Sequence, residues 1–178
     1  MLEITYRELL AVITVLWIAA RIIIRANGNK ISAARELKLL MVYICIIVIM
    51  RIVDFPWHLT DGHIGTLKFD ASKIFPLWLN LIPIVHLFDI YDGWKLNVFG
   101  NIAMFIPVGI VWPVCFKKLD TVGKTVLAGF IFTLSIEISQ LLFYERCSDI
   151  DDIILNTAGT FIGALLYFGI RKLIRKRS

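Results

Sequence analysis

The sequence has little charge and few cysteines. Only 19% of its 178 residues are Asp, Glu, Lys or Arg, against about a quarter in soluble domains. So few polar residues cannot cover a hydrophobic core with a hydrated surface, which excludes an ordinary water-soluble enzyme. Three cysteines are too few for a disulfide scaffold or a zinc site built from cysteine. Apolar residues make up 58% of the chain, which excludes intrinsic disorder as well.

Long apolar runs account for most of the chain. A helix that crosses a bilayer needs about 20 mostly apolar residues. Five runs approach this length with few charges, most of them near the ends of the runs, where long basic side chains can reach the interface. We therefore predict an all-α integral membrane helical bundle, folded as a single polytopic domain over residues 1–178. Its predicted spans are about 6–24, 37–55, 96–116, 125–144 and 153–170.

The first run could also be read as a secretory signal peptide. Glu3 and Glu8 oppose this interpretation, because a signal peptide begins with a basic region. A cleavage site of small residues is also missing before the following basic loop. We therefore expect the first run to remain in the mature chain as a membrane span.

The basic residues of the short loops predict an orientation. Residues 21–38, 117–124 and 171–178 together carry 13 basic and two acidic residues, whereas the rest of the chain carries six basic and twelve acidic residues. Because loops rich in Lys and Arg stay in the cytoplasm, we expect an outside N-terminus and a cytoplasmic C-terminus. The basic tail should contact anionic membrane lipid, and nothing in the pattern supports nucleic acid as a partner.

An outer segment at 56–95 separates the second and third predicted spans. It is too long for a turn and too apolar for a free loop, and Pro76 and Pro83 prevent one continuous helix. Its many aromatic and aliphatic residues predict a segment that lies at the membrane interface, with a short amphipathic helix near 84–91.

The three histidines of the chain all fall in this outer segment. Their spacing is not that of a zinc site, so zinc is the less favoured interpretation of His58, His63 and His86. We expect no metal and no other cofactor.

A polar stripe interrupts the fourth predicted span. A carboxylate at the centre of a bilayer costs about 2.5–3.5 kcal/mol, so Glu137 is a candidate for a functional site. At 100° per residue, Thr133, Glu137, Gln140 and Tyr144 would share one face of a helix. Such a face should contact protein or water rather than lipid.

The two neighbouring spans carry amide side chains at a similar depth. Asn97 and Asn101 are four residues apart in the third span, and Asn156 follows the start of the fifth by about one turn. Together with Glu137 and Gln140, they predict a polar pocket between the third, fourth and fifth spans that opens to the outside.

The loop between the fourth and fifth spans would surround this pocket with charge. Asp149 and Asp152 are three residues apart, and Arg146 could pair with Asp149 or bind a phosphate or carboxylate in a fork. Alternatively, these residues only cap the fifth helix and close the loop. A divalent cation is a less favoured alternative, because the acidic residues lack the spacing of a known cation loop.

Gly159 and Gly163 in the fifth span have the small-xxx-small spacing of close helix contacts. Such glycines let a second helix approach the backbone directly. We therefore predict that they pack against a neighbouring helix rather than bind a ligand.

Several of these motifs, taken in order, resemble the VanZ-like family of bacterial membrane proteins. The resemblance covers about the C-terminal 100 residues and departs from the family pattern at Glu145 and Cys147. The similar stretches are NLIP (80–83), NVFGNIAMFIPVG (97–109), the Glu and Gln of SIEISQLLF (135–143) and RCSDIDDIILNTAGTFIG (146–163).

The resemblance implies a role at the outer face of the bacterial cytoplasmic membrane. The family is named for a glycopeptide-resistance component associated with teicoplanin, so it implies an effect on glycopeptide susceptibility or envelope lipids. The implied partners are membrane lipid and either a lipid-linked envelope precursor or a lipoglycopeptide.

Two other functions compete with this one. An intramembrane enzyme could use Glu137 as a general base, but the sequence pairs no nucleophile with a base, so we favour a non-enzymatic function. A transporter is the other alternative, and the lack of repeat symmetry opposes it.

Overall fold

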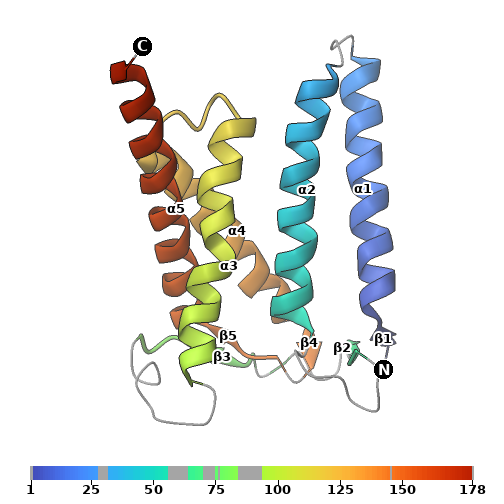
Figure 1. The fold of residues 1–178 in the computed structure, drawn as a ribbon. Helices are drawn as coiled ribbons and strands as arrows, with labels where there is room; N and C mark the ends of the chain where they lie inside the picture. Colours follow the sequence, from blue (N-terminus) through green and yellow to red (C-terminus); the bar gives the residue numbers. More distant parts are fainter. Residues whose placement is uncertain are drawn as a thin grey trace. The chain divides into compact units, whose positions relative to one another are not determined.

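The chain folds into five helices and short strands within the residues that the structure, a computed structural model, describes: 2–27, 32–55, 64–69, 75, 77–83, 94–144 and 146–177. This confirms the prediction of a mostly helical membrane protein. The chain forms two compact units, one of Met1–Ile74 with Phe143–Glu145 and one of Phe75–Leu142 with Arg146–Ser178. The helices, shown in Figure 1, are α1 (Tyr6–Ala26), α2 (Ala33–Asp54), α3 (Trp94–Cys115), α4 (Val122–Gln140) and α5 (Ile150–Arg177).

Four stretches of helix in the described part of the chain are long and apolar enough to cross a membrane. They are Tyr6–Ala26, Trp94–Cys115, Val122–Gln140 and Ile150–Lys176. The predicted second span does form α2, but every stretch of 18 residues in α2 contains at least three charged residues, so α2 does not belong to this set. Its insertion in the membrane, and therefore the fifth span, stays a prediction.

In the first unit, α1 and α2 contact each other through polar and aromatic side chains at widely spaced points, and the aromatic contacts include the rings of Trp17 and Tyr43. Near one end, Arg21 of α1 forms an ion pair with Glu36 of α2. Near the middle, the hydroxyl groups of Thr14 and Tyr43 lie 2.7 Å apart and share a hydrogen bond. The start of α1 is capped by Thr5, whose side chain and backbone exchange hydrogen bonds with its first turn.

A small antiparallel sheet in the same unit joins β1 (Leu2–Ile4), β2 (Leu67–Phe69) and β4 (Phe143–Tyr144). β4 corrects the expected end of the fourth helix, because α4 ends at Gln140 and not at residue 144. The backbone of Tyr144 pairs with Lys68 of β2, so Tyr144 does not continue the polar stripe of α4.

In the second unit, α3, α4 and α5 form a bundle in which α3 and α5 touch backbone to backbone (Figure 1). A Cβ atom added at Gly159 of α5 would lie 2.1 Å from the carbonyl oxygen of Ile102 of α3. One turn later, a Cβ at Gly163 would lie 2.1 Å from the carbonyl oxygen of Ile106. These two positions therefore accept no side chain without moving the helices apart, and they place the polar residues of α3 and α5 close together.

The start of α5 also differs from the expectation. The helix begins at Ile150, whereas the predicted span begins at residue 153, and it extends past residue 170 to Arg177. Asp149 explains the early start, because its side chain accepts a hydrogen bond of 2.8 Å from the backbone N–H of Asp151, as an N-cap residue does. Asp151 and Asp152 then occupy the first turn, where the helix dipole favours negative charge.

The predicted interfacial helix near 84–91 lies outside the described residues. The same is true of His58, His63 and His86, so the zinc alternative lies there as well.

Candidate functional site

A two-stranded parallel pairing brings a distant segment to the start of α5. β3 (Leu79–Asn80) pairs with β5 (Ser148–Asp149), and Asn80 lies opposite Asp149. The backbone N–H of Ser148 donates to the carbonyl oxygen of Trp78 at 3.0 Å. The Asn80 side chain then donates from Nδ2 to Oδ2 of Asp149 at 3.0 Å. Asn80 therefore holds the carboxylate that caps α5.

Asp149 also connects α4 to α5. Its backbone N–H donates to Oε2 of Glu137 at 3.0 Å. Glu137 lies in the last turn of α4 and is 1% exposed, so this carboxylate is fully enclosed by protein. The buried Gln140 follows it at the end of the same helix.

A second set of hydrogen bonds connects α3 to α5. Nδ2 of Asn101 donates to Oδ1 of Asp152 at 2.5 Å and to Oδ1 of Asn97 at 2.9 Å. Asn101 is buried, Asp152 is half-buried and Asn97 is exposed. The set therefore extends from the enclosed interior to the surface of the unit.

A third contact lies one turn further along α5. Nδ2 of Asn156 donates to Oγ1 of Thr133 of α4 at 2.9 Å, and the hydroxyl of Thr160 donates to the carbonyl oxygen of Asn156 at 3.1 Å. Asn156, Thr133 and Thr160 are all at most 1% exposed. All three predicted helices thus contribute polar side chains to one group, which is made of three hydrogen-bonded sets at Asp149, Asp152 and Asn156, next to one another at the start of α5.

We call this group the polar cluster. It consists of Asn80, Asn97, Asn101, Thr133, Glu137, Asp149, Asp152 and Asn156.

Two buried acceptors of the polar cluster lack a donor within the described ranges. These atoms are Oε1 of Glu137 and Oδ1 of Asn156. A buried acceptor without a partner costs about 1–3 kcal/mol, and native proteins rarely leave one unexplained. Each atom can accept a hydrogen bond from a hydroxyl group, an amine or a water molecule, or contact a cation, and the Ser148 side chain also interacts with the Glu137 carboxylate.

The chemistry of the surrounding loop is acidic, with one basic residue. Arg146 is half-buried in the loop just before β5. Cys147 follows it, and partial burial together with the carboxylate of Asp149 raises the pKa of its exposed thiol. Across the described residues, no three His, Cys, Asp or Glu side chains are grouped so that they could hold a metal ion.

The sequence profile of the VanZ/LLP1 family matches residues 40–174. The chain belongs to this family. Protein VanZ of Enterococcus faecium is 37% identical over 89 residues, which cover 50% of this chain and 52% of that protein. The chain therefore spans about half the length of the curated relative that it matches. No solved structure matches the chain.

This VanZ-family member is a multi-pass membrane protein with four candidate spans. The family match begins inside α2 and ends near the end of α5, so it includes every residue of the polar cluster. Gly159 and Gly163 also lie within it.

Sequence reasoning did not include Asn80 or Thr133 among the candidate site residues. Asn80 belongs to the NLIP motif, but its role depends on the pairing of β3 with β5. Strands of two residues are too short to be predicted from a sequence pattern. Thr133 belongs to the predicted polar stripe and could have been chosen, because it lies one turn from Glu137 on the same face.

Proposed function

We propose that this VanZ-family protein binds the polar head of an amphiphilic envelope molecule at the outer face of the bacterial cytoplasmic membrane. Binding of a lipoglycopeptide, or of a lipid-linked envelope precursor, would then change susceptibility to antibiotics of the teicoplanin type. The observation that supports this proposal is the pair of buried acceptors without donors, Oε1 of Glu137 and Oδ1 of Asn156.

The carboxylates of the polar cluster favour ligand groups that donate hydrogen bonds. Glu137, Asp149 and Asp152 contribute carboxylates, and each of them already accepts a hydrogen bond from the chain. Remaining acceptor positions suit hydroxyl groups of sugars and protonated amines, which both supply hydrogen-bond donors. The acyl chain of such a ligand would stay in membrane lipid beside the bundle.

The outward orientation is part of the proposal, and the charge of the loops supports it. Cys147 lies in the loop at the polar cluster, whereas Cys115 is the last residue of α3, at its other end. In a Cys45→Ser variant, a membrane-impermeant thiol reagent should label Cys147 in intact cells and Cys115 only after permeabilisation. Because the pKa of the Cys147 thiol is raised, labelling should be faster in alkaline buffer. The reverse pattern of labelling would place the polar cluster at the cytoplasmic face.

Susceptibility assays test the function itself. Expression of the protein in a susceptible host should raise the inhibitory concentration of teicoplanin and leave that of a glycopeptide without an acyl chain unchanged. Glu137→Gln has nearly the same volume and can still accept from the Asp149 amide, but it replaces the second acceptor with a donor. We expect this variant and Glu137→Leu to abolish the protection while the protein remains in the membrane.

Ser135→Ala is the matched control on the same helix. The Ser135 side chain is exposed and bonds only to the carbonyl oxygen of Ile131, as far as the described residues show. This variant should protect like the original protein. Full protection by Glu137→Gln at normal protein levels would contradict the proposal.

An intramembrane enzyme is the second candidate, and the same oxygen of Glu137 favours it. A buried carboxylate with one free oxygen can remove a proton from a substrate hydroxyl group. Purified protein in lipid vesicles would then turn over a lipid-linked envelope intermediate, and Glu137→Gln would stop the turnover. Turnover that persists in Glu137→Gln would exclude this mechanism, and binding without any turnover would favour the first function.

A further inference from the structure

The second half of α5 reaches further than the other described helices of its bundle. The helix has 28 residues and is therefore about 42 Å long, whereas the hydrocarbon core of a bilayer is about 30 Å thick. With Ile150 at one edge of the hydrocarbon, Arg171 lies about 32 Å away and Arg175 about 38 Å away. In a helix placed in this way, both guanidinium groups would lie at the depth of the phosphate groups of the opposite leaflet.

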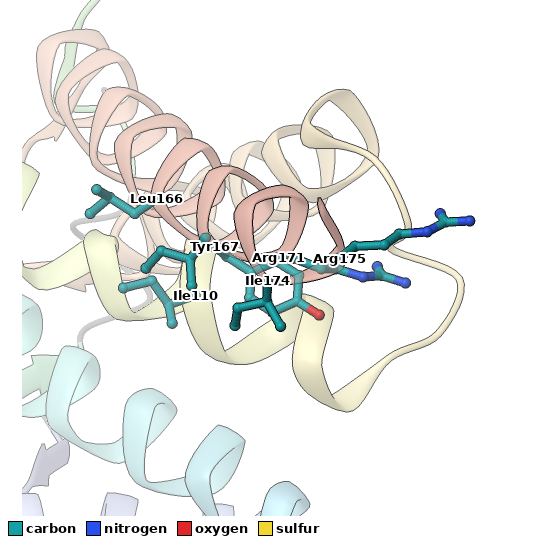
Figure 2. Close-up of a pocket in the computed structure, with 7 residues that line it drawn as sticks. Ile110, Leu166, Tyr167, Arg171, Ile174 and Arg175 are labelled. Atoms are coloured by element: carbon teal, nitrogen blue, oxygen red, sulfur yellow. The ribbon is translucent and has the colours of Figure 1, made fainter. Parts of the chain in front are cut away.

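A groove of about 420 Å³ runs along this part of α5 beside α3. Figure 2 shows the guanidinium groups of Arg171 and Arg175 at the opposite end of the groove from Leu166. The walls are aliphatic apart from Tyr167. The groove is lined by Ile110 of α3 and by Leu166, Tyr167, Ile170, Arg171, Ile174 and Arg175 of α5.

We propose that this groove binds one anionic phospholipid of the leaflet at the C-terminal end of α5, with its phosphate on Arg171 and Arg175 and an acyl chain along the aliphatic wall. Arg171 and Arg175 are four residues apart, so both guanidinium groups project from one face of the helix. Guanidinium groups bind phosphate oxygens through charge-assisted, often bidentate hydrogen bonds. An aliphatic wall that leads into the hydrocarbon from this pair matches the shape and polarity of a phospholipid.

The proposal is independent of the polar cluster. The groove lies near the other end of α5, and none of its lining residues belongs to the polar cluster. A variant that loses lipid binding therefore says nothing about the proposed function of the polar cluster. Likewise, a polar cluster that has no effect on antibiotic susceptibility would not contradict lipid binding in the groove.

The neighbouring lysines provide a control that distinguishes lipid binding in the groove from the general attraction of a basic tail to anionic lipid. Lys172 and Lys176 lie at nearly the same depth and have the same spacing as the two arginines, but they do not line the groove. Replacing Lys172 and Lys176 with Gln removes the same charge as replacing Arg171 and Arg175 with Gln. If the groove binds lipid through the arginines, the arginine double variant should retain less lipid than the lysine double variant.

The test uses the full chain, extracted in a mild detergent from vesicles of equal parts phosphatidylglycerol and phosphatidylcholine. Native mass spectrometry then measures how much of each lipid the protein retains. We expect retention of one phosphatidylglycerol, and a loss of about tenfold or more in Arg171→Gln/Arg175→Gln, because this variant loses the charge-assisted hydrogen bonds of both guanidinium groups to the phosphate. Lys172→Gln/Lys176→Gln should change retention less than about twofold. Equal losses in both double variants, or equal retention of phosphatidylcholine, would overturn the proposal.

A second pair of variants tests the acyl chain. Leu166 and Leu165 are neighbours on α5 with exposed fractions of 49% and 48%, but only Leu166 lines the groove. Leu166→Trp fills the groove and should reduce retention of phosphatidylglycerol, whereas Leu165→Trp should not. If soluble glycerol phosphate binds as tightly as the phospholipid, or if both tryptophan variants retain lipid normally, the aliphatic wall has no role in binding.

Discussion

The two units of the chain pack their helices in different ways. In the first unit, none of the residues of α1 is buried, although α1 is the most hydropathic of the four candidate spans. In the second unit, buried residues make up 28% of an apolar 18-residue stretch of α3, 28% of one in α4 and 33% of one in α5. Hydropathy therefore does not predict burial in this protein.

The difference follows from what brings helices together in lipid. Lipid is as apolar as leucine, so apolar side chains alone give little attraction between helices. The second unit uses glycines that allow backbone contact, and the enclosed surfaces then hold the polar cluster. In the first unit, α2 buries Leu39, Val42, Ile49 and Asp54, but α1 buries no residue. The polar contacts of α1 with α2 are few, and Arg21 with Glu36 and Thr14 with Tyr43 are the clearest. Substitutions should therefore cost more in the second unit than in the first.

The largest expected effect is that of Gly159→Ala. The new Cβ would overlap the carbonyl oxygen of Ile102, so α3 and α5 must separate, at a cost of about 2–3 kcal/mol in the free energy of unfolding. Gly100→Ala on α3 is the control, because a Cβ there meets nothing within 4 Å, and the helix should gain up to about 1 kcal/mol. Unfolding in sodium dodecyl sulfate, followed by circular dichroism, measures both. Similar effects at the two glycines would contradict the tight packing of α3 on α5.

A smaller loss is expected for Asn101→Ala. This change removes the donor to Oδ1 of Asp152 inside the bundle and should lower the free energy of unfolding by about 1–2 kcal/mol. The matched control is Asn97→Ala, since Asn97 lies one turn away on the same helix face and is exposed. The same unfolding assay should show a clearly smaller effect there, and an equal effect would mean that burial does not strengthen this contact.

In the first unit, Arg21→Gln should have a modest effect. The side chains of Arg21 and Glu36 are 19% and 34% exposed, so the ion pair should contribute less than about 1 kcal/mol. A double-mutant cycle with Glu36→Gln isolates the coupling between the two residues. A coupling larger than that of Asn101 with Asp152 would reverse the comparison between the units.

The smallest effect is expected for Tyr43→Phe. Thr14 already donates to the carbonyl oxygen of Leu10 at 2.6 Å, so its hydroxyl group keeps a partner when the Tyr43 hydroxyl is removed. The loss should be close to the average of about 0.6 kcal/mol for a hydrogen bond between membrane helices. Unfolding of Tyr43→Phe in the same assay measures it, and a loss above about 2 kcal/mol would show that α1 and α2 depend on this one contact.

Much of the bundle could be predicted because helices in lipid have a strong signature. Apolar runs identified the helices, and the 100° period placed Thr133, Glu137 and Gln140 on one face, where the structure buries all three. Similar depth also suggested that Asn101 and Asn156 would come close to this face. Whether these residues bind a ligand stays a prediction.

The ends of the helices were harder to predict, because short backbone pairings decide them. Tyr144 has the right phase to extend α4, but β4 pairs it with β2 instead. The early start of α5 had a readable signal, since Asp149 followed by two further acidic residues is typical of a helix N-terminus. The pairing of Asn80 with Asp149 had no signal in the sequence, because a strand of two residues is too short to show an alternation of polar and apolar residues.

The sequence by itself determined which segments are apolar enough for lipid and which face of each helix is polar, because both follow from composition and the fixed rise and turn of a helix. Only the tertiary structure decided which polar groups meet. Asn101 reaches Asp152 across 51 positions of the chain because Gly159 and Gly163 let α3 and α5 touch, and the approach of the two helices depends on the absence of Cβ atoms at these positions. The fold also buries Glu137 beside the start of α5 and leaves its Oε1 without a hydrogen-bond partner in the described structure, and that atom is the strongest reason to look for a ligand.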